Sequence, residues 1–302
     1  MPKFSVIIPL YNKEKYITEC LQSVMQQTFS DFEIVVVDDG SSDNSVDTIN
    51  KTIHDNRIRI ISQKNAGPSA ARNTGIKAAL GEWIVFLDAD DLFLPWALST
   101  FDRLIEQKCG QQYYICNYYL GCQNRYLLFT QKKSDCVVKR PFLWEFLEIL
   151  SDRPGSAVYK RDLLLRHLFN ESLRRFEDAE SQYAILNEVN PYQCSIPVMI
   201  SNRDYSEAAG YRKNINEDFV GHISFENKSF SECLVLYKIA FGAKKGYGAQ
   251  VETLYHEQFK RLDYKICYFL CKLWNKVYRI VRKKKEYSME DIFRGETRVN
   301  SV

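Results

Sequence analysis

The stretch FSVIIPLYNKEKYITECLQSVMQQTFSDFEIVVVDDGSSD, residues 4–43, decides the fold of this chain. It opens with a short apolar run at residues 4–9 and reaches a second at 33–38, and both runs have the β-branched content of buried strands. Between them, residues 15–27 repeat apolar side chains at helical spacing. Strand, helix and strand in this order predict two parallel strands covered by the helix.

The same alternation continues along the chain. Apolar runs at 58–62 and 83–88 predict two more strands, and residues 45–53 and 70–80 have the length and composition of helices. We therefore predict an α/β, Rossmann-like fold with a mostly parallel central sheet flanked by helices. Ligands bind at the carboxyl ends of the strands in such sheets, so the polar residues that follow these strands are the first candidates for a site.

Beyond residue 108 the pattern is less regular. A helix is predicted at 95–107, a hairpin over 113–130, and a helical C-terminal extension from about 230 to 285, with the last fifteen or so residues loose. Residues 201–228 are polar without a clear period, which suggests a mobile loop. The predicted organisation has three parts: a regular α/β half at 1–108, a less regular half with a mobile loop at 109–228, and a basic helical extension at 229–302.

The composition excludes several classes of protein. Of the 302 residues, 45% are apolar and 26% are charged, which is typical of a globular chain rather than a disordered one. Nine cysteines form no CxxC pair and four histidines stand apart, so neither a disulfide framework nor a zinc site is expected. The sequence has neither the apolar core of a signal peptide nor a run long enough to span a membrane, so we expect a cytoplasmic protein.

The net charge of +3 is unevenly distributed. Residues 260–285 contain ten Lys or Arg and a single Asp, a balance of +9, so the rest of the chain carries −6. The basic charge therefore belongs to the C-terminal extension, and we expect an anionic surface as its partner rather than a nucleic acid.

Two acids follow the second predicted strand, in VVVDDGSSD. Asp38 and Asp39 stand where a carboxylate accepts hydrogen bonds from a nucleobase imide or a ribose hydroxyl. An Asx turn that caps the next helix is the alternative.

Three acids follow the fourth predicted strand, in FLDADDLF. Asp88, Asp90 and Asp91 suit a hard divalent cation such as Mn²⁺ or Mg²⁺, which binds carboxylate and phosphate oxygens together. The alternative is an acidic helix N-terminus, which the helix dipole would favour.

Two further motifs carry charge next to predicted helices. Arg72 lies in NAGPSAARNTGI, about a turn into a helix that begins near Gly67, and faces either a nucleotide or solvent. Glu177 and Asp178, in RRFEDAESQY, stand just before another helix, where either acid serves as a general base or simply favours the helix start.

Taken together, SVIIPLYNKEKYITECLQSVMQQTF, EIVVVDDGSSD, NAGPSAARNTGI and GEWIVFLDADD, in this order and at these spacings, resemble the family 2 glycosyltransferases of GT-A fold. The resemblance covers residues 4 to about 108 almost continuously, and it implies that 1–108 is the nucleotide-sugar-binding half and 109–228 the acceptor-binding half with the catalytic base. It implies an inverting transferase that moves a sugar from a nucleotide-diphosphate-sugar, most commonly a UDP-sugar, to a glycan or lipid-linked saccharide in cell-surface polysaccharide synthesis. A catalytically silent nucleotide-sugar or glycan-binding protein of the same fold is the alternative.

The resemblance also implies roles for individual residues. Donor-binding roles fall on Pro9, Tyr11, Asp39, Arg72 and Asp88. Pro9 and Tyr11 would frame the nucleobase and Asp39 would read it. The DxD element falls on Asp88-Ala89-Asp90, with Asp90 the principal ligand of Mn²⁺ or Mg²⁺, Asp88 near the ribose or the metal, and Asp91 behind them.

Past residue 108 the resemblance is weaker. The family's Glu-Asp pair fits Glu177 and Asp178, with the role of catalytic base on Asp178. A diphosphate-closing segment matches residues 201–214 only loosely, and Arg203 and Arg212 are more simply read as solvated loop residues than as diphosphate contacts.

The C-terminal extension contains an amphipathic basic helix over 260–285, with apolar side chains at helical spacing from Leu262 to Val281. Such a helix can lie on an anionic leaflet, which would hold the enzyme at the inner face of the cytoplasmic membrane near a lipid-linked acceptor. The alternative is that its apolar stripe packs on the catalytic domain.

Overall fold

The N-terminal strands are β1 (Phe4–Leu10), β2 (Phe32–Asp38), β3 (Ile58–Ser62) and β4 (Trp83–Phe86). They lie in the order β4-β1-β2-β3, and every neighbouring pair is parallel. All residues of β2 and β4 are buried, as expected for strands that are covered on both faces. The four strands predicted from the sequence are thus present and parallel. The computed structural model describes residues 1–108, 110–122, 125–129, 135–146, 153–174, 176–202, 215–247, 249–281 and 286–294.

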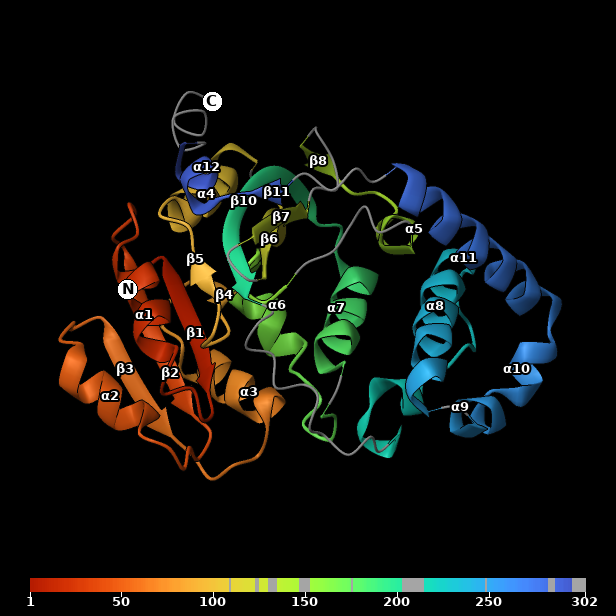
Figure 1. Ribbon diagram of the computed structural model, residues 1–302, viewed down its shortest axis with the longest axis horizontal. Helices are drawn as coiled ribbons and strands as arrows, with labels where there is room; N and C mark the ends of the chain where they lie inside the picture. Colours follow the sequence, from red (N-terminus) through yellow and green to blue (C-terminus); the bar gives the residue numbers. More distant parts are fainter. Residues whose placement is uncertain are drawn as a thin grey trace.

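The helices between these strands divide between the two faces of the sheet (Figure 1). One face is covered by α1 (Ile17–Met25), α2 (Ser45–Thr52) and α4 (Ala97–Gln107), whose apolar side chains form one core cluster with the strands. The other face is covered by α3 (Pro68–Ala78), together with later helices. Gly75 of α3 lies so close to β1 that a Cβ atom there would stand 2.4 Å from Cγ2 of Ile7, which shows how closely this helix packs on the sheet.

Antiparallel strands extend the sheet beyond β4. The further strands are β5 (Leu92–Phe93), β6 (Tyr113–Cys122), β7 (Arg125–Phe129), β8 (Cys136–Val137), β9 (Ala157–Lys160), β10 (Tyr192–Asn202) and β11 (Glu286–Tyr287). Within the described residues the main path runs β11-β7-β6-β9-β4-β1-β2-β3, and β10 runs parallel to β6. Short connections such as that between β6 and β7 permit only antiparallel pairing, so this half of the sheet is mixed.

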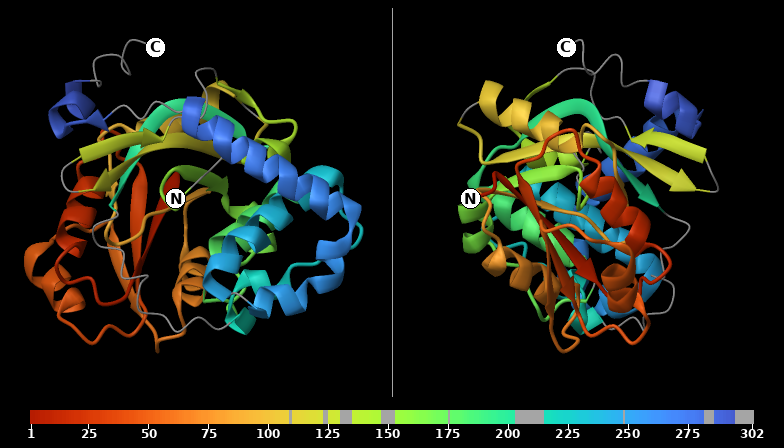
Figure 2. Two further views of the ribbon diagram at one scale, coloured as in Figure 1. Left: turned by 45° about the vertical axis from the view of Figure 1, so that its right-hand side comes forward. Right: turned by 90° about the vertical axis from the view of Figure 1, so that its left-hand side faces the viewer.

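The remaining helices lie mainly on the α3 side of the sheet and beyond it (Figures 1 and 2). They are α5 (Pro141–Phe146), α6 (Arg161–Arg166), α7 (Glu177–Glu188), α8 (Phe230–Tyr247), α9 (Ala249–Leu254), α10 (His256–Lys260) and α11 (Leu262–Val281). The helical extension predicted from about residue 230 is confirmed, and its described residues up to 281 form α8, α9, α10 and α11. No helix within the described ranges has both the length and the apolar character that crossing a membrane requires.

The expectation of loose residues at the C-terminus is wrong for 289–294. These residues form α12 (Met289–Arg294), and Ile292 is buried in a small cluster with Leu94, Trp96 and Tyr119. Tyr287 of β11 contacts Tyr119 edge to face, with ring centroids 5.6 Å apart. These contacts join the segment to residues about 170 to 200 positions earlier in the chain, so no local sequence pattern predicts them. In the predicted loop at 201–228, two short 3₁₀ helices occupy Ile215–Glu217 and Phe219–His222.

Candidate functional site

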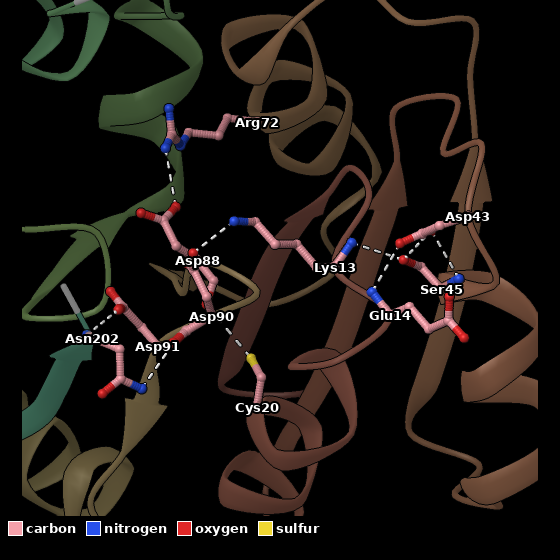
Figure 3. Close-up of polar contacts among 10 residues, drawn as sticks. All are labelled: Lys13, Glu14, Cys20, Asp43, Ser45, Arg72, Asp88, Asp90, Asp91 and Asn202. Carbon is pink, nitrogen blue, oxygen red and sulfur yellow. Dashed lines mark hydrogen bonds and ion pairs between the residues drawn. The ribbon is translucent and has the colours of Figure 1, made fainter. Parts of the chain in front are cut away.

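The candidate site lies at the carboxyl ends of β1, β2 and β4. These strands are parallel and adjacent, so the residues that follow them meet at one edge of the sheet. Figure 3 shows Lys13 from the β1 end and Asp88, Asp90 and Asp91 from the β4 end converging there, with Arg72 of α3 reaching Asp88. The structure thus brings together motifs that lie up to about eighty residues apart in the sequence.

The turn after β2 separates the two acids of the Asp-Asp pair. Oδ1 of Asp38 accepts a hydrogen bond from the backbone N–H of Ser41 at 3.0 Å, and Gly40 between them has a φ of 75° that suits glycine. Asp38 therefore supports the turn itself, and it does not cap α2, whose N-cap residue is Asn44. Asn12, after β1, supports the same turn by accepting a hydrogen bond from Ser42 N–H at 2.8 Å.

Asp39 is buried beneath the loop that leads into α3. Oδ1 accepts hydrogen bonds from Nε2 of Gln63 at 2.8 Å and from Ala66 N–H at 2.9 Å, and Oδ2 accepts one from Gly67 N–H at 2.8 Å. A carboxylate has about four acceptor positions, so Asp39 keeps roughly one for a ligand. Pro9 and Tyr11 lie on the neighbouring strand end, where Pro9 is paired with Val37 and Tyr11 is 45% exposed.

Arg72 joins the two halves of the site. Its guanidinium lies 3.1 Å from Oδ1 of Asp88, after β4, and 3.0 Å from Oε1 of Glu177, at the start of α7. The side chain is only 6% exposed and lies 5.4 Å from the ring centroid of Phe169. Burial alone would lower the pKa of Arg72, but the charges of Asp88, Glu177 and Asp178 raise it, so the guanidinium stays positive. The alternative of a solvated surface arginine is therefore wrong.

The three acids after β4 have three different environments. The side chain of Asp88 is 36% exposed, whereas that of Asp90 is 15% exposed and lies 2.8 Å from Nζ of Lys13. Burial and the charge of Asp88 raise the pKa of Asp90, although the hydrogen bond from Lys13 opposes this. Asp91 is buried and accepts a hydrogen bond from Asn202 N–H at 2.8 Å. Its position behind the other two is as expected, and burial raises its pKa well above the ordinary value.

The donor set fits a hard divalent cation that is shared with a substrate. Asp88 and Asp90 supply carboxylate oxygens, and each of them is neutralised by a cationic side chain of the protein itself. Among the described residues, no three His, Cys, Asp or Glu side chains gather closely enough to hold a metal alone. Mg²⁺ characteristically uses one or two carboxylates together with substrate phosphates, so two acids suffice when a diphosphate is bound.

The acids at the start of α7 point in different directions. Glu177 is 12% exposed and is directed to Arg72, while Asp178 is exposed and accepts a hydrogen bond from Ala179 N–H at 2.8 Å. Phe176, just before them, has a φ of 55°, a left-handed conformation that is costly for a large side chain. Phe176, at the N-cap position, provides no side-chain hydrogen bond to this helix. Glu177 is therefore a partner of Arg72 rather than a helix cap, and Asp178 is the acid that remains available.

A cavity of about 200 Å³ lies beside Asp178. Aromatic side chains and an arginine are prominent in its lining, which includes Phe86, Arg153, Tyr159, Phe169, Phe176, Asp178 and Gln182. Nε2 of Gln182 is buried and lacks a hydrogen-bond partner in the part of the chain that is described. The cavity therefore combines apolar ring faces with a cation and a free donor, a combination suited to a polar organic ligand.

Sequence reasoning missed several residues of this site. Lys13 was detectable, since it follows β1 at the same sheet edge as the acids. Arg153 and Asn202 carried no such signal, because they reach the site through pairings of β9 and β10 that depend on distant strands. The loop arginines Arg203 and Arg212 lie outside the described residues.

Comparisons with known proteins agree with one another. The sequence profile of glycosyl transferase family 2 matches residues 5–168. The chain is 36% identical over 199 residues to the uncharacterized glycosyltransferase EpsJ of Bacillus subtilis, which is 62% of this chain and 57% of EpsJ. It is 31% identical over 195 residues to glycosyltransferase GlyG of Streptococcus pneumoniae, which is 59% of this chain and 63% of GlyG. The chain thus covers less than two thirds of either relative.

Solved structures share the fold. The crystal structure of S. aureus TarS 1-349 in complex with UDP-GlcNAc superposes with a TM-score of 0.66 at 22% identity, over 89% of this chain and 79% of that one. The mannosyltransferase PcManGT from Pyrobaculum calidifontis, in complex with GDP-Man and Mn2+, gives a TM-score of 0.54 at 18% identity, over 93% and 76%.

Proposed function

The chain belongs to glycosyl transferase family 2, with the GT-A architecture, and from this membership we propose that it is an inverting glycosyltransferase. It moves a sugar from a nucleoside-diphosphate donor to a glycan or lipid-linked saccharide in cell-surface polysaccharide synthesis. The observation that carries the proposal is the position of Arg72, which ties the acids of the donor rim to the acid pair on α7. The acids assigned to the donor and those assigned to the acceptor thereby lie on either side of one buried guanidinium group, that of Arg72.

The donor binds to the first half of the chain, residues 1–108. Pro9 and Tyr11 frame the nucleobase, and the remaining acceptor position of Asp39 takes the imide N–H of uracil. The TarS structure in complex with UDP-GlcNAc supports a UDP-sugar, whereas PcManGT is in complex with GDP-Man, so the base is part of the test.

Asp90, with Asp88, holds the divalent cation, Mn²⁺ or Mg²⁺. The cation supplies charge neutralisation for the departing diphosphate. Lys13 and Arg72 neutralise the same carboxylates within the protein itself, and both are within reach of the negative charge that a diphosphate brings.

Asp178 is the general base. The acceptor hydroxyl gives its proton to the Asp178 carboxylate as its oxygen bonds to the anomeric carbon, and the bonding pair of the broken C–O bond leaves with the nucleoside diphosphate. Base and leaving group stand on opposite sides of the carbon, so a single displacement inverts its configuration. Arg72 engages Glu177 and leaves Asp178 exposed for this task.

The acceptor binds to the second half of the chain, residues 109–228, in the cavity beside Asp178. Sugar rings pack on aromatic faces, and Phe176 offers one there with 40% of its surface exposed. Arg153 and Gln182 provide donors for hydroxyl or anionic groups of the acceptor. If the acceptor is lipid-linked, the enzyme acts at the inner face of the cytoplasmic membrane.

Thermal shift with nucleoside diphosphates, with and without Mn²⁺, tests the donor assignment. Ligands that bind only the native state raise its apparent stability. We expect UDP with Mn²⁺ to stabilise the protein more than GDP or than either ligand without metal. Release of free sugar from a panel of nucleotide sugars then separates an enzyme from a silent binding protein of the same fold. If no nucleoside diphosphate shifts the unfolding temperature, the proposed function is wrong.

A further inference from the structure

Helix α11 has two apolar faces, and among the side chains that the structure describes one face is buried in the molecule while the other is exposed. Tyr264 and Cys267 are buried on the first face. Tyr264 packs edge to face on Tyr237 of α8, with centroids 5.0 Å apart, and stacks on Phe259 at 4.4 Å. This face fixes the helix to the outside of α8, at the margin of the molecule (Figure 1).

The second face is an exposed apolar stripe of large side chains: Leu262 (73% exposed), Ile266 (43%), Phe269 (64%) and Leu273 (49%). Their spacing of four, three and four residues places them on one line along the helix. That line is roughly opposite Tyr264 and Cys267, so it points away from α8. The sequence-based alternative, in which the apolar stripe packs on the domain, therefore holds for the opposite face and not for these four residues.

Basic side chains run along one edge of this exposed stripe. Lys265 and Lys272 each follow a stripe residue by three positions, and both are exposed, as is Arg261 just before the helix. The helix belongs to the segment 260–285, which carries ten basic residues and one acidic residue. An exposed apolar line bordered by positive charge is complementary to a surface that is apolar inside and anionic at its boundary.

We propose that α11 lies flat on an anionic lipid bilayer. The exposed stripe enters the boundary between headgroups and acyl chains, and Lys265 and Lys272 meet the lipid phosphates. A second copy of this chain is the other possible cover for such a face. Two-fold pairing through the stripe would bring two strongly basic segments together, and their repulsion argues against it.

The proposal does not depend on the catalytic assignments, because vesicle binding needs no donor. The full-length protein is sedimented with vesicles of phosphatidylcholine alone or with about one third phosphatidylglycerol. We expect strong partition only to the anionic vesicles, weakening as salt is added because the charges are exposed. Equal partition to both kinds of vesicle, or none to the anionic ones, would overturn the proposal.

Paired variants locate the contact. Phe269→Ser with Leu273→Ser should reduce partition to anionic vesicles at least tenfold. Leu165→Ser with Leu168→Ser, which alters two comparably placed residues near α6 that are 39% and 37% exposed, should leave it unchanged. Lys265→Gln with Lys272→Gln should reduce the partition and its salt dependence together. Equal effects of the α11 and α6 pairs would mean that the stripe is not the contact.

Light scattering after size-exclusion chromatography tests the alternative in which a second copy of the chain covers the exposed stripe. A monomer in the absence of lipid agrees with the proposal, whereas a dimer that Phe269→Ser dissociates would overturn it. Thermal unfolding of each variant without ligand serves as the folding control, and we expect it to be unchanged because all substituted residues are exposed. A failure of nucleotide binding would reject the proposed function and leave the vesicle result standing.

Discussion

Nζ of Lys13 lies 2.8 Å from Oδ2 of Asp90, the carboxylate that we assign to the divalent cation. Both side chains are largely buried, at 18% and 15% exposed. The ammonium and a metal ion on the same carboxylate group would repel each other, because both are cations. A bound cation would therefore weaken the ion pair of Lys13, and a donor diphosphate would offer the lysine a new anionic partner.

Replacing Lys13 should separate its effect on metal binding from its effect on binding of the donor diphosphate. We expect Lys13→Met to bind Mn²⁺ several-fold more tightly without nucleotide, since a lost partly buried ion pair corresponds to about 1 kcal/mol. The same variant should bind nucleoside diphosphate with Mn²⁺ more weakly. Isothermal titration of each ligand measures both, with Lys15→Met at an exposed neighbouring position as the control. Unchanged affinities in Lys13→Met would show that the ion pair does not compete with the metal.

The partnership of Arg72 and Glu177 should appear in a double-mutant cycle. Arg72→Met leaves the Glu177 carboxylate buried without its partner, and breaking a buried pair in this way costs about 3–5 kcal/mol of unfolding free energy. Adding Glu177→Gln should recover a large part of that loss, because the unpaired charge is then gone. Urea unfolding of the four proteins measures the coupling. Strictly additive changes would contradict a direct interaction.

Asp178→Asn should lower turnover roughly 10²–10⁴-fold, the usual contribution of a general base. The nucleoside diphosphate affinity should stay within twofold of the original, because the donor rim is untouched. Glu180→Gln, one half-turn along α7, provides a matched loss of a carboxylate and should retain activity. Weakened donor binding in Asp178→Asn would show that this residue binds the donor rather than acting as the base.

Glu232 on α8 should make stability depend on pH. It accepts hydrogen bonds from the hydroxyl of Tyr183 on α7 at 2.9 Å and from Ser229 N–H at 2.8 Å. Burial alone would raise the pKa of Glu232, but these hydrogen bonds outweigh it and the pKa is lowered. The native state then binds a proton less readily than the unfolded chain, so the stabilisation is present above the unfolded pKa of about 4.3 and is lost as pH falls through the native value.

In Glu232→Gln we therefore expect the unfolding free energy at pH 7 to fall by about 1.5 kcal/mol, the lower end of the usual range for hydrogen bonds to a charged group. The difference in unfolding free energy between this variant and the original protein should disappear at acidic pH. Urea unfolding at pH 7, 5 and 3.5 measures this, and Glu226→Gln at an exposed site is the control. A gap that stays constant with pH would show that the carboxylate charge is not involved.

The N-terminal strands were predictable because each is a continuous apolar run that is buried on both faces. The prediction placed β3 at its observed bounds, and the others within a few residues. The short strands β5, β8 and β11 were not predictable, because each has two residues and is defined only by its partner. The antiparallel pairing of β9 with β4 was not predictable either, because it too depends on a partner strand far away in the sequence.

The site was predictable where residues directly follow strands and less so where contacts are long-range. Asp88 and Asp90 follow β4, so their shared position could be expected from the sequence. The bond between Arg72 and Glu177, 105 residues apart, could not. Asp39 shows a further limit: its residue type suits nucleobase recognition, yet only the structure reveals that three hydrogen bonds from the loop between β3 and α3 take most of its acceptor positions.

The strand β11 pairs antiparallel with β7, so the chain returns to the sheet after α11. A protein shortened to end before residue 286 would expose the backbone N–H and C=O groups of Tyr126 and Leu127, the part of β7 with which β11 pairs, to strands from other molecules. Such truncations should precipitate or form aggregates, and their failure to bind vesicles would carry no information. Any purification tag that must later be cleaved is better placed at the N-terminus.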